Sequence, residues 1–320
     1  MSSKALSPFE PDAVSDEIKA QNKELISRLE RLPDKWAFPP ADIRKARLEG
    51  KGPFPLAEPD PAAEIREIDG PHGSIPLRIM RPSQGACRGV YFHIHGGGWV
   101  LGTAAENDPR NRRIADQCGL AVVSVDYRLA PEHPYPQGPD DCEAAACWLI
   151  EQCKALFDTD ILLIGGESAG AHLAVVTLLR LRDRHNTVPF RAANLVAGCY
   201  DLTLTPSVRN WGTEPLIINT RDVQKFVENF LKDDGDPNDA DISPLYADLT
   251  GLPPALFSVG TRDLLLDDSL FMVQRWQSAG LQAALEVYPG GCHVFQAFTS
   301  ALSEDSQARM DLFLKQAVAG

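Results

Sequence analysis

The sequence predicts an α/β fold in which a mostly parallel central sheet is flanked by helices on both faces. Short apolar runs recur from about residue 64 onward, and segments with helical periodicity separate most of them. Because these runs are apolar on both faces, they are typical of buried parallel strands rather than of a sheet with one solvated face. At 320 residues, one large α/β domain is as reasonable as two smaller ones.

The predicted strands begin near Glu64. Residues 64–69 and 74–80 are two expected strands joined by the turn sequence GPHG. Further strands are expected at 90–94, 121–125, 161–164, 193–197, 255–259 and 283–288. The predicted helices are 107–118, 139–152, 169–182, 267–279 and 303–318.

Two segments lie outside this alternation. Residues 15–32 have the apolar spacing of an amphipathic helix, and residues 33–62, rich in Pro, Gly and charge, predict an irregular connection. The strands that end at 197 and begin at 255 are too far apart for an ordinary crossover, and the chain between them holds Trp211 and a helical apolar stripe.

We interpret residues 1–50 and 203–245 as the two parts of a helical cap over one end of the sheet, with the core at 51–202 and 246–320. The alternative is that the insertion only adds packing to the flank of the sheet.

The charge balance excludes some classes of partner. The formal net charge is −13, from 31 Lys and Arg residues against 44 Asp and Glu residues. This disfavours nucleic acid or an anionic membrane surface, because both are bound chiefly by clustered basic side chains. No apolar run approaches the roughly 20 residues that span a bilayer, so no transmembrane helix is expected.

The N-terminus and the cysteines bear on the compartment. The first residues lack the apolar stretch of a secretory signal. The seven cysteines form no CxxC pair, which argues against a disulfide framework and against a structural zinc site. A cytoplasmic location is expected.

The sequence GESAG at 166–170 follows a predicted buried strand and precedes a predicted helix. This order is that of a nucleophile elbow, a tight turn with small neighbours that lifts the Ser168 hydroxyl to the top of the sheet. Taken alone, the pattern is equally compatible with a Gly-rich turn that holds an ordinary serine. The neighbouring motifs decide between these interpretations.

The sequence HGGGW at 95–99 comes directly after the predicted strand 90–94. A run of glycines lets the backbone approach a substrate and turn its N–H groups inward. Together with the N–H of Ala169, such donors would stabilise the oxyanion of a tetrahedral intermediate. A phosphate-binding loop is the rival interpretation, but the sequence has neither the P-loop pattern nor GxGxxG at the start of a helix.

His293 is the predicted general base. It follows the last predicted strand and precedes the last helix, at the carboxyl edge of the sheet where Ser168 also emerges. His172 is expected to pack into the sheet, and His93 is expected to face away from the site. Solvated loops are expected to hold His72, His133 and His185.

Asp263 is the predicted acid that orients the base. It comes immediately after the predicted strand 255–259, between the nucleophile and the base in chain order. Its competitors Asp267 and Asp268 have the position of an acidic first helical turn. Asp201 is a weaker candidate because it follows an earlier strand.

Together these motifs resemble the hormone-sensitive-lipase-like family of α/β-hydrolases, the bacterial family IV esterases, over about residues 60–316. The matching stretches are HGGGW at 95–99, DYRLAPE at 126–132, GESAG at 166–170, DLLLD at 263–267 and HVF at 293–295. The resemblance implies a catalytic triad of Ser168, Asp263 and His293. It also implies Gly97, Gly98 and Ala169 as the oxyanion donors.

The resemblance carries two further implications. The family's cap of N-terminus and insertion corresponds to the segments assigned above, and the stretch 126–132 is expected to brace the site from behind. Glu167 departs from the Asp or Thr that more frequent members carry. This departure leaves the triad intact and leaves open the subgroup and the mode of dimerisation.

The expected function is that of a serine carboxylesterase that hydrolyses short- to medium-chain acyl esters through an acyl-enzyme, without a metal or organic cofactor. Trp99 and Trp211 are expected to bind substrate by narrowing the acyl pocket. The expected partner is a small-molecule ester, and a homodimer is compatible with the resemblance. The alternatives are an amide or formamide hydrolase and, outside enzymes, a non-catalytic binding protein, which the presence of all three triad residues disfavours.

Overall fold

The computed structural model describes residues 7–232 and 235–319. The start of the predicted cap at 1–6, positions 233 and 234 of the predicted insertion, and Gly320 lie outside the described residues. The strands are β1 (Glu64–Ile68), β2 (Ile75–Met80), β3 (Gly89–Ile94), β4 (Leu120–Val125), β5 (Leu162–Glu167), β6 (Phe190–Val196), β7 (Ala255–Arg262) and β8 (Ala283–Cys292). The helices are α1 (Asp16–Leu29), α2 (Pro40–Leu48), α3 (Asp108–Cys118), α4 (Gln137–Phe157), α5 (Ala169–His185), α6 (Pro206–Trp211), α7 (Thr220–Leu231), α8 (Leu266–Ser278) and α9 (Ala301–Ala319).

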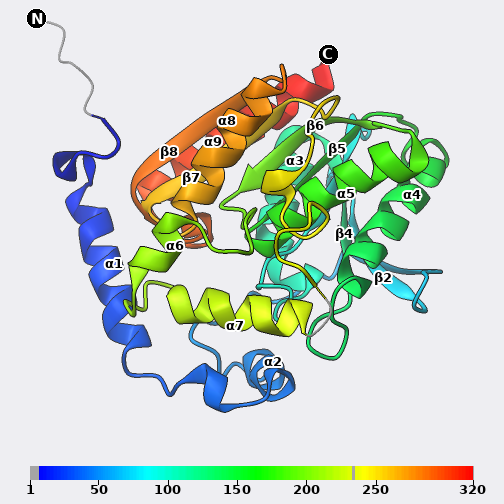
Figure 1. The fold of residues 1–320 in the computed structure, drawn as a ribbon. Helices are drawn as coiled ribbons and strands as arrows, with labels where there is room; N and C mark the ends of the chain where they lie inside the picture. The colour runs from blue at the N-terminus through cyan, green and yellow to red at the C-terminus, as the bar shows by residue number, and fades with distance from the viewer. Residues whose placement is uncertain (1–6, 233–234, 320) are drawn as a thin grey trace, which may run out of the picture.

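The eight described strands form one sheet in the order β1-β2-β4-β3-β5-β6-β7-β8 (Figure 1). β2 pairs antiparallel with both β1 and β4, and every other pairing is parallel. Each predicted strand has a counterpart within a few residues of its expected ends. The predicted α/β fold with a mostly parallel sheet is confirmed.

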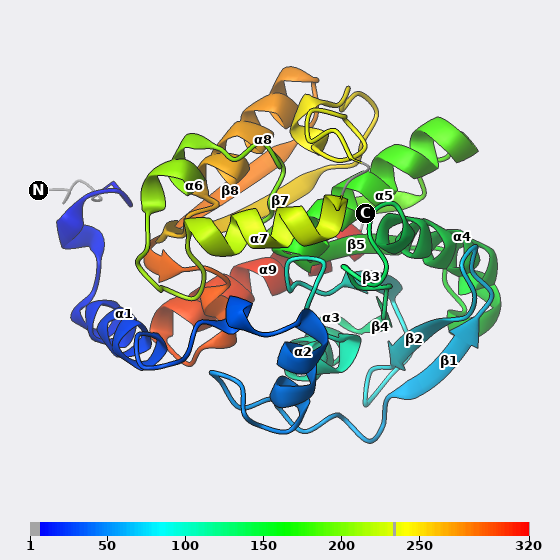
Figure 2. The ribbon, with the colours of Figure 1, turned by 60° about the horizontal axis from the view of Figure 1, so that its bottom comes forward.

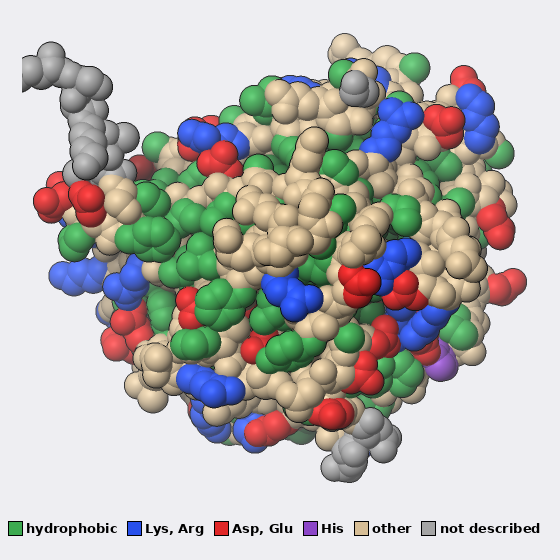
Figure 3. Space-filling model, turned by 45° about the horizontal axis from the view of Figure 1, so that its top comes forward, with side chains coloured by type: hydrophobic (Ala, Val, Ile, Leu, Met, Phe, Trp, Pro, Cys, Tyr) green, Lys and Arg blue, Asp and Glu red, His purple; other side chains and the backbone are tan. Residues whose placement is uncertain are grey.

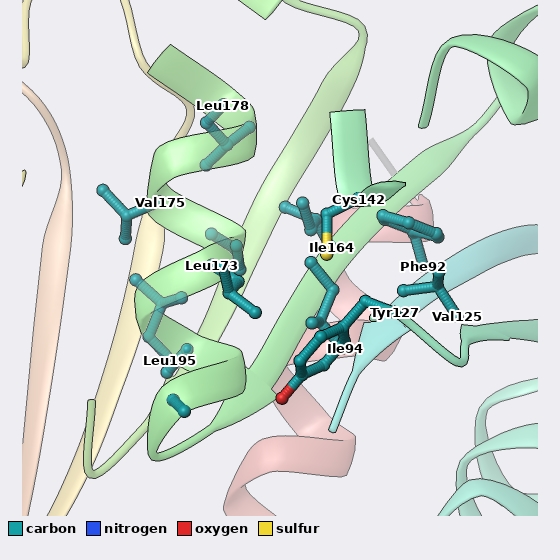
Figure 4. Close-up of a cluster of buried hydrophobic side chains, with 14 of the residues drawn as sticks. Phe92, Ile94, Val125, Tyr127, Cys142, Ile164, Leu173, Val175, Leu178 and Leu195 are labelled. Atoms are coloured by element: carbon teal, nitrogen blue, oxygen red, sulfur yellow. The ribbon is translucent and has the colours of Figure 1, made fainter. Parts of the chain in front are cut away.

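The sheet is buried on both faces. Phe92 and Ile164 belong to the apolar cluster that β3 and β5 form with α4 and α5 (Figure 4). Their chain neighbours Tyr91 and Leu163 point to the other face and join the cluster with α3 and α9. This two-sided burial explains why the strands are continuous apolar runs rather than alternating patterns.

The segment 33–62, expected to be irregular, contains the short helix α2. Pro40 is its first residue, where the missing N–H and fixed φ of proline are compatible with a helix. None of the α2 residues is fully buried, because this helix lies at the surface. Its sequence therefore lacks the strong apolar stripe from which a helix is predicted. The prediction of a wholly irregular connection was wrong here.

α1 packs against the edge of the sheet near the end of β8. The Ser15 hydroxyl accepts a hydrogen bond from the Ile18 N–H at the start of the helix, and the Ile18 side chain is buried. The Asn22 side chain donates to the carbonyl of Gly290 over 2.8 Å. The first predicted helix is therefore fixed to the carboxyl end of the last strand.

The segment after α1 also contacts the insertion, and in Figure 2 the chain that joins α1 to α2 runs below α7. The Trp36 indole N–H donates to Asp222 over 2.7 Å, and its ring meets the Phe226 ring edge-on at 5.0 Å. The Arg44 guanidinium of α2 donates to the carbonyl of Val100 over 2.8 Å. Two segments far apart in sequence thus form one cover over this end of the sheet.

The surface carries charges of both signs. Acidic and basic side chains are interspersed on the face drawn in Figure 3. Among the helices of the described residues, none is long and apolar enough to cross a membrane.

Gly170→Ala tests how tightly α5 packs against β3. An alanine normally stabilises a helix relative to glycine by about 1 kcal/mol, but a Cβ here would overlap the carbonyl oxygens of Ile94 and His95. We expect a loss of about 3 kcal/mol in the free energy of unfolding, measured by urea denaturation. Gly85→Ala is the control, because Gly85 has a φ of 80° and nothing within 4 Å, and it should lose about 1 kcal/mol. Equal stability of the two variants would contradict the packing described here.

Candidate active site

Ser168 lies at a sharp turn between β5 and α5. Its backbone has φ 55° and ψ −122°, a conformation that few side chains adopt. A Cβ at Gly166 or at Gly170 would overlap the Ile94 carbonyl, so both neighbouring positions require glycine. The Ser168 N–H donates to the Val196 carbonyl of β6 over 2.8 Å. The GESAG sequence therefore has the strand–turn–helix geometry of a nucleophile elbow.

The structure brings Ser168, His293 and Asp263 together in one chain of hydrogen bonds. His293 Nε2 lies 2.9 Å from Ser168 Oγ, and its Nδ1 lies 3.0 Å from each carboxylate oxygen of Asp263. His293 follows directly on β8, and Asp263 follows directly on β7. Both are buried. With Nδ1–H donated to the carboxylate, Nε2 is free to accept the serine proton.

The competing acids have other partners. Asp268 accepts hydrogen bonds from the backbone N–H groups of Tyr200 and Asp201, and Asp267 accepts from the Ser207 N–H. Burial raises the pKa of Asp268 to about 7. These carboxylates fix the chain that follows β6, and Asp263 alone of the predicted acids faces His293.

The other histidines near the site are enclosed and bonded. His172 Nδ1 accepts from the Trp99 indole N–H over 3.1 Å, and its Nε2 donates to the Ile242 carbonyl over 2.7 Å. Burial lowers the pKa of His172 to about 4, so this ring is neutral. The predicted packed role of His172 agrees with these contacts, and His93 is buried behind the site.

The loop after β3 has the backbone of an oxyanion site. Gly97 and Gly98 have φ values of 117° and 62°. Within the described residues, neither N–H of this pair has a hydrogen-bond acceptor. Ala169 is the first residue of α5, where a helix does not use its own N–H. All three of these residues line the same cavity as Ser168 and His293.

The stretch 126–132 contacts this loop from behind. The Tyr127 hydroxyl donates to the His95 carbonyl over 3.0 Å, and the Ala130 N–H donates to the Trp99 carbonyl over 2.9 Å. These contacts fit the bracing role expected from the sequence.

The cavity above Ser168 has a volume of about 840 Å³, within the usual range for small-molecule sites. Its lining is mostly apolar and comes from both covering segments as well as from the sheet. Phe226 lies against the loop after β3, since a Cβ at Gly98 would overlap its ring, and Trp36 packs edge-on against Phe226. Side chains that shape the pocket therefore also contact this loop.

The two predicted substrate-binding tryptophans are placed differently. Trp99 lines the cavity, although only 3% of its surface is exposed and its ring stacks on Phe230 at 4.7 Å. Trp211 is not among the lining residues: its indole donates to the Glu214 carbonyl and its ring lies under Arg262. The expectation that Trp211 narrows the pocket was wrong, because α6 turns it toward the neighbouring loop.

Sequence reasoning missed some residues of the site. Trp36 lay in a segment expected to be irregular, and nothing local indicates that it reaches α7. Phe226 belonged to the recognised apolar stripe, but the stripe alone does not tell which residue meets Gly98. Cys199 and Leu265 also line the cavity, and each follows a strand end, which is the signal that could have found them.

The described residues contain no group of three or more His, Cys, Asp or Glu side chains that could hold a metal ion.

The fold and this constellation define a class, the serine hydrolases of α/β-hydrolase fold, and comparisons with known proteins agree. Residues 91–297 match a protein family described as having the alpha/beta hydrolase fold. An esterase of Acinetobacter venetianus is 34% identical over 232 residues, covering 72% of this chain and 75% of its own. An acetyl esterase of Salmonella choleraesuis is 30% identical over 256 residues, covering 76% of each chain.

Among solved structures, an esterase from the bacterial hormone-sensitive lipase family superimposes with a TM-score of 0.81 at 29% identity, covering 95% of this chain and 99% of that one. The chain belongs to the hormone-sensitive-lipase-like family of α/β-hydrolases. It is a carboxylic ester hydrolase.

The neutral state of His172 predicts a contribution to stability that acid removes. Its pKa is lowered in the folded protein from about 6.5 to about 4, so its contribution is present above pH 6.5 and is lost as the pH falls through 4. Asp268, with its raised pKa, acts in the opposite direction over this range, so the His172 contribution is isolated by a variant. His172→Gln keeps an acceptor for Trp99 and a donor for Ile242 but cannot titrate, so the stability of wild type relative to this variant, measured by urea denaturation, should fall by about 3 kcal/mol between pH 6.5 and pH 4. An identical slope in both proteins would contradict the assignment.

Proposed function

We propose that Ser168 is the nucleophile, His293 the general base and Asp263 the orienting acid of this esterase. The observation that carries the proposal is the position of the His293 ring, 2.9 Å from the Ser168 hydroxyl and 3.0 Å from the Asp263 carboxylate. A neutral imidazole so bonded takes the serine proton and becomes an imidazolium beside a buried carboxylate that stabilises it.

The proposed reaction has two halves. Ser168 Oγ attacks the ester carbonyl carbon while its proton moves to His293 Nε2, and collapse of the tetrahedral intermediate transfers that proton to the leaving alcohol. A water then attacks the acyl-enzyme, gives its proton to the same nitrogen, and releases the acid and the free serine. No oxidant, metal or further cofactor takes part in this cycle.

The proposed oxyanion donors are the N–H groups of Gly97, Gly98 and Ala169. Support comes from their shared cavity with Ser168, from the positive φ of both glycines and from the unused N–H at the start of α5. Donors fixed before the reaction begins stabilise the developing charge without reorganisation, and each contributes roughly 10²–10³ in kcat.

We propose neutral esters of short- to medium-chain acids as the substrates. Among the described residues that line the cavity, each basic side chain is paired with an acid: Lys35 with Asp222, Arg47 with Glu106, Lys51 with Glu49, and Arg221 with Asp34. Among these described lining residues, no basic side chain is therefore left without an acidic partner to bind an anionic substrate. The similarity to an acetyl esterase supports a small acyl group.

The proposed domain organisation is a cap of residues 1–50 and 203–245 on a core of 51–202 and 246–320. The contacts of Trp36 with Asp222 and Phe226 support a cap that acts as one unit. We also propose a cytoplasmic location, supported by seven free cysteines, and a homodimer, for which the edge strand β8 offers the part of its length that lies away from its contact with α1 at Gly290.

A series of p-nitrophenyl esters from acetate to palmitate tests both the substrate class and the nucleophile. We expect kcat/KM to be highest between acetate and octanoate, and Ser168→Ala to lower kcat by about 10⁴-fold or more on every ester. Thermal melting of the variant should match wild type, since only a hydroxyl at the pocket floor is removed. A preference for palmitate would contradict the proposed short- to medium-chain substrates. An active Ser168→Ala protein would contradict the proposal that Ser168 is the nucleophile.

A further inference from the structure

Glu167, the residue immediately before the nucleophile, is the one part of the GESAG motif to which the reaction cycle gives no role. Its side chain is 17% exposed at the edge of the cavity. One carboxylate oxygen accepts the Gly96 N–H over 2.6 Å and the Asn107 amide over 3.2 Å. The other lies 3.0 Å from His93 Nε2. A single carboxylate therefore connects the elbow to β3, to the oxyanion loop and to the chain before α3.

The contact with Gly96 is the important one for catalysis. Gly96 directly precedes Gly97 and Gly98, so a hydrogen bond to its N–H fixes the loop where it leaves β3. The proposed oxyanion donors come from two separate segments, the loop after β3 and the Ala169 end of the elbow. Since Glu167 belongs to the elbow, its bond to Gly96 sets the position of one segment relative to the other.

The surroundings keep this carboxylate charged and held in place. Burial acts to raise the pKa of Glu167, but His93 and the Gly96 N–H outweigh it and hold the pKa of the carboxyl below its usual range. His93 Nδ1 lies 3.3 Å from the Asn111 amide nitrogen and 2.8 Å from the Ser124 hydroxyl. Because an ionised carboxylate only accepts hydrogen bonds, His93 Nε2 is the donor in the contact with Glu167.

This arrangement also limits repulsion between the carboxylate and the oxyanion. Both carboxylate oxygens are occupied by donors from Gly96, Asn107 and His93, so the negative charge is stabilised by these groups. A carboxylate with no such donors beside an oxyanion site would oppose the reaction.

We propose that Glu167 is a positioning residue that holds the oxyanion loop in register with the nucleophile elbow through its bond to the Gly96 N–H. The inference rests on the proposed roles of Ser168 and of the three oxyanion donors. It makes a distinct claim, because the hydrogen bonds of the Glu167 side chain go to His93, Gly96 and Asn107 and not to Ser168, His293 or Asp263.

The test compares Glu167→Ala and Glu167→Gln with wild type, using kcat, KM and the inhibition constant of an aryl boronic acid. The boronate adduct of serine places an oxygen in the oxyanion site, so its affinity reports the alignment of the donors. Glu167→Ala should lower kcat by about tenfold to a hundredfold and weaken boronate inhibition by a similar factor, with KM near that of wild type. Glu167→Gln keeps one acceptor for Gly96 and should lose less, about threefold to tenfold.

Glu143→Ala is the matched control. The Glu143 side chain is 13% exposed, similar to that of Glu167, and it also pairs with a histidine, His185. Glu143 belongs to α4 and is not among the residues that line the cavity. It should leave kcat and boronate inhibition at wild-type values. Hydrogen exchange of the peptide 95–101 gives an independent readout and should be faster in both Glu167 variants but not in this control.

Unchanged kcat and boronate affinity in Glu167→Ala would overturn the inference. If Glu167→Ala does not melt cooperatively, the same measurements on Glu167→Gln test the inference instead. Wild-type kcat and boronate affinity in Glu167→Gln would then overturn the inference. Ser168→Ala is measured in parallel. If it is active, the proposed function fails, whereas an inactive Ser168→Ala beside a normal Glu167→Ala refutes only the role of Glu167.

Discussion

The backbone turn at Ser168 is the constraint on which the rest of the site depends. A non-glycine residue with φ 55° is strained by about 1–3 kcal/mol and persists only where its surroundings fix it. Here β5, the first turn of α5 and the bond from the Ser168 N–H to Val196 supply that restraint. The Ile94 carbonyl forbids a side chain at Gly166 and at Gly170. One turn therefore sets the direction of the hydroxyl and the start of α5 together.

The loop after β3 that carries the proposed oxyanion donors is, in turn, held by elements from across the chain. Phe226 of α7 packs on Gly98, Phe230 of the same helix stacks on Trp99, and Arg44 of α2 donates to the Val100 carbonyl. The helices α2 and α7 thus pack directly against the loop. Substitutions in these helices should therefore change turnover as well as acyl preference, because the same side chains shape the pocket and support the loop.

Much of this could be predicted from the sequence, for identifiable physical reasons. Buried parallel strands leave apolar runs, and side chains that follow strand ends meet at one edge, so the proximity of Ser168, Asp263 and His293 could be predicted from their places in the chain. Helix α2 was missed because it buries no residue fully, and Trp211 was misplaced because an apolar stripe does not reveal which way a short helix turns. The partners of Trp36 and Glu167 could not be predicted, since each depends on contacts between residues far apart in sequence.

Labelling with a fluorophosphonate tests most directly whether the imidazole activates the serine. We expect one label per chain, found by peptide mass spectrometry on Ser168, and labelling at least about a hundredfold slower in a folded His293→Ala protein. A label on another residue, or a His293→Ala protein that reacts at the wild-type rate, would contradict it.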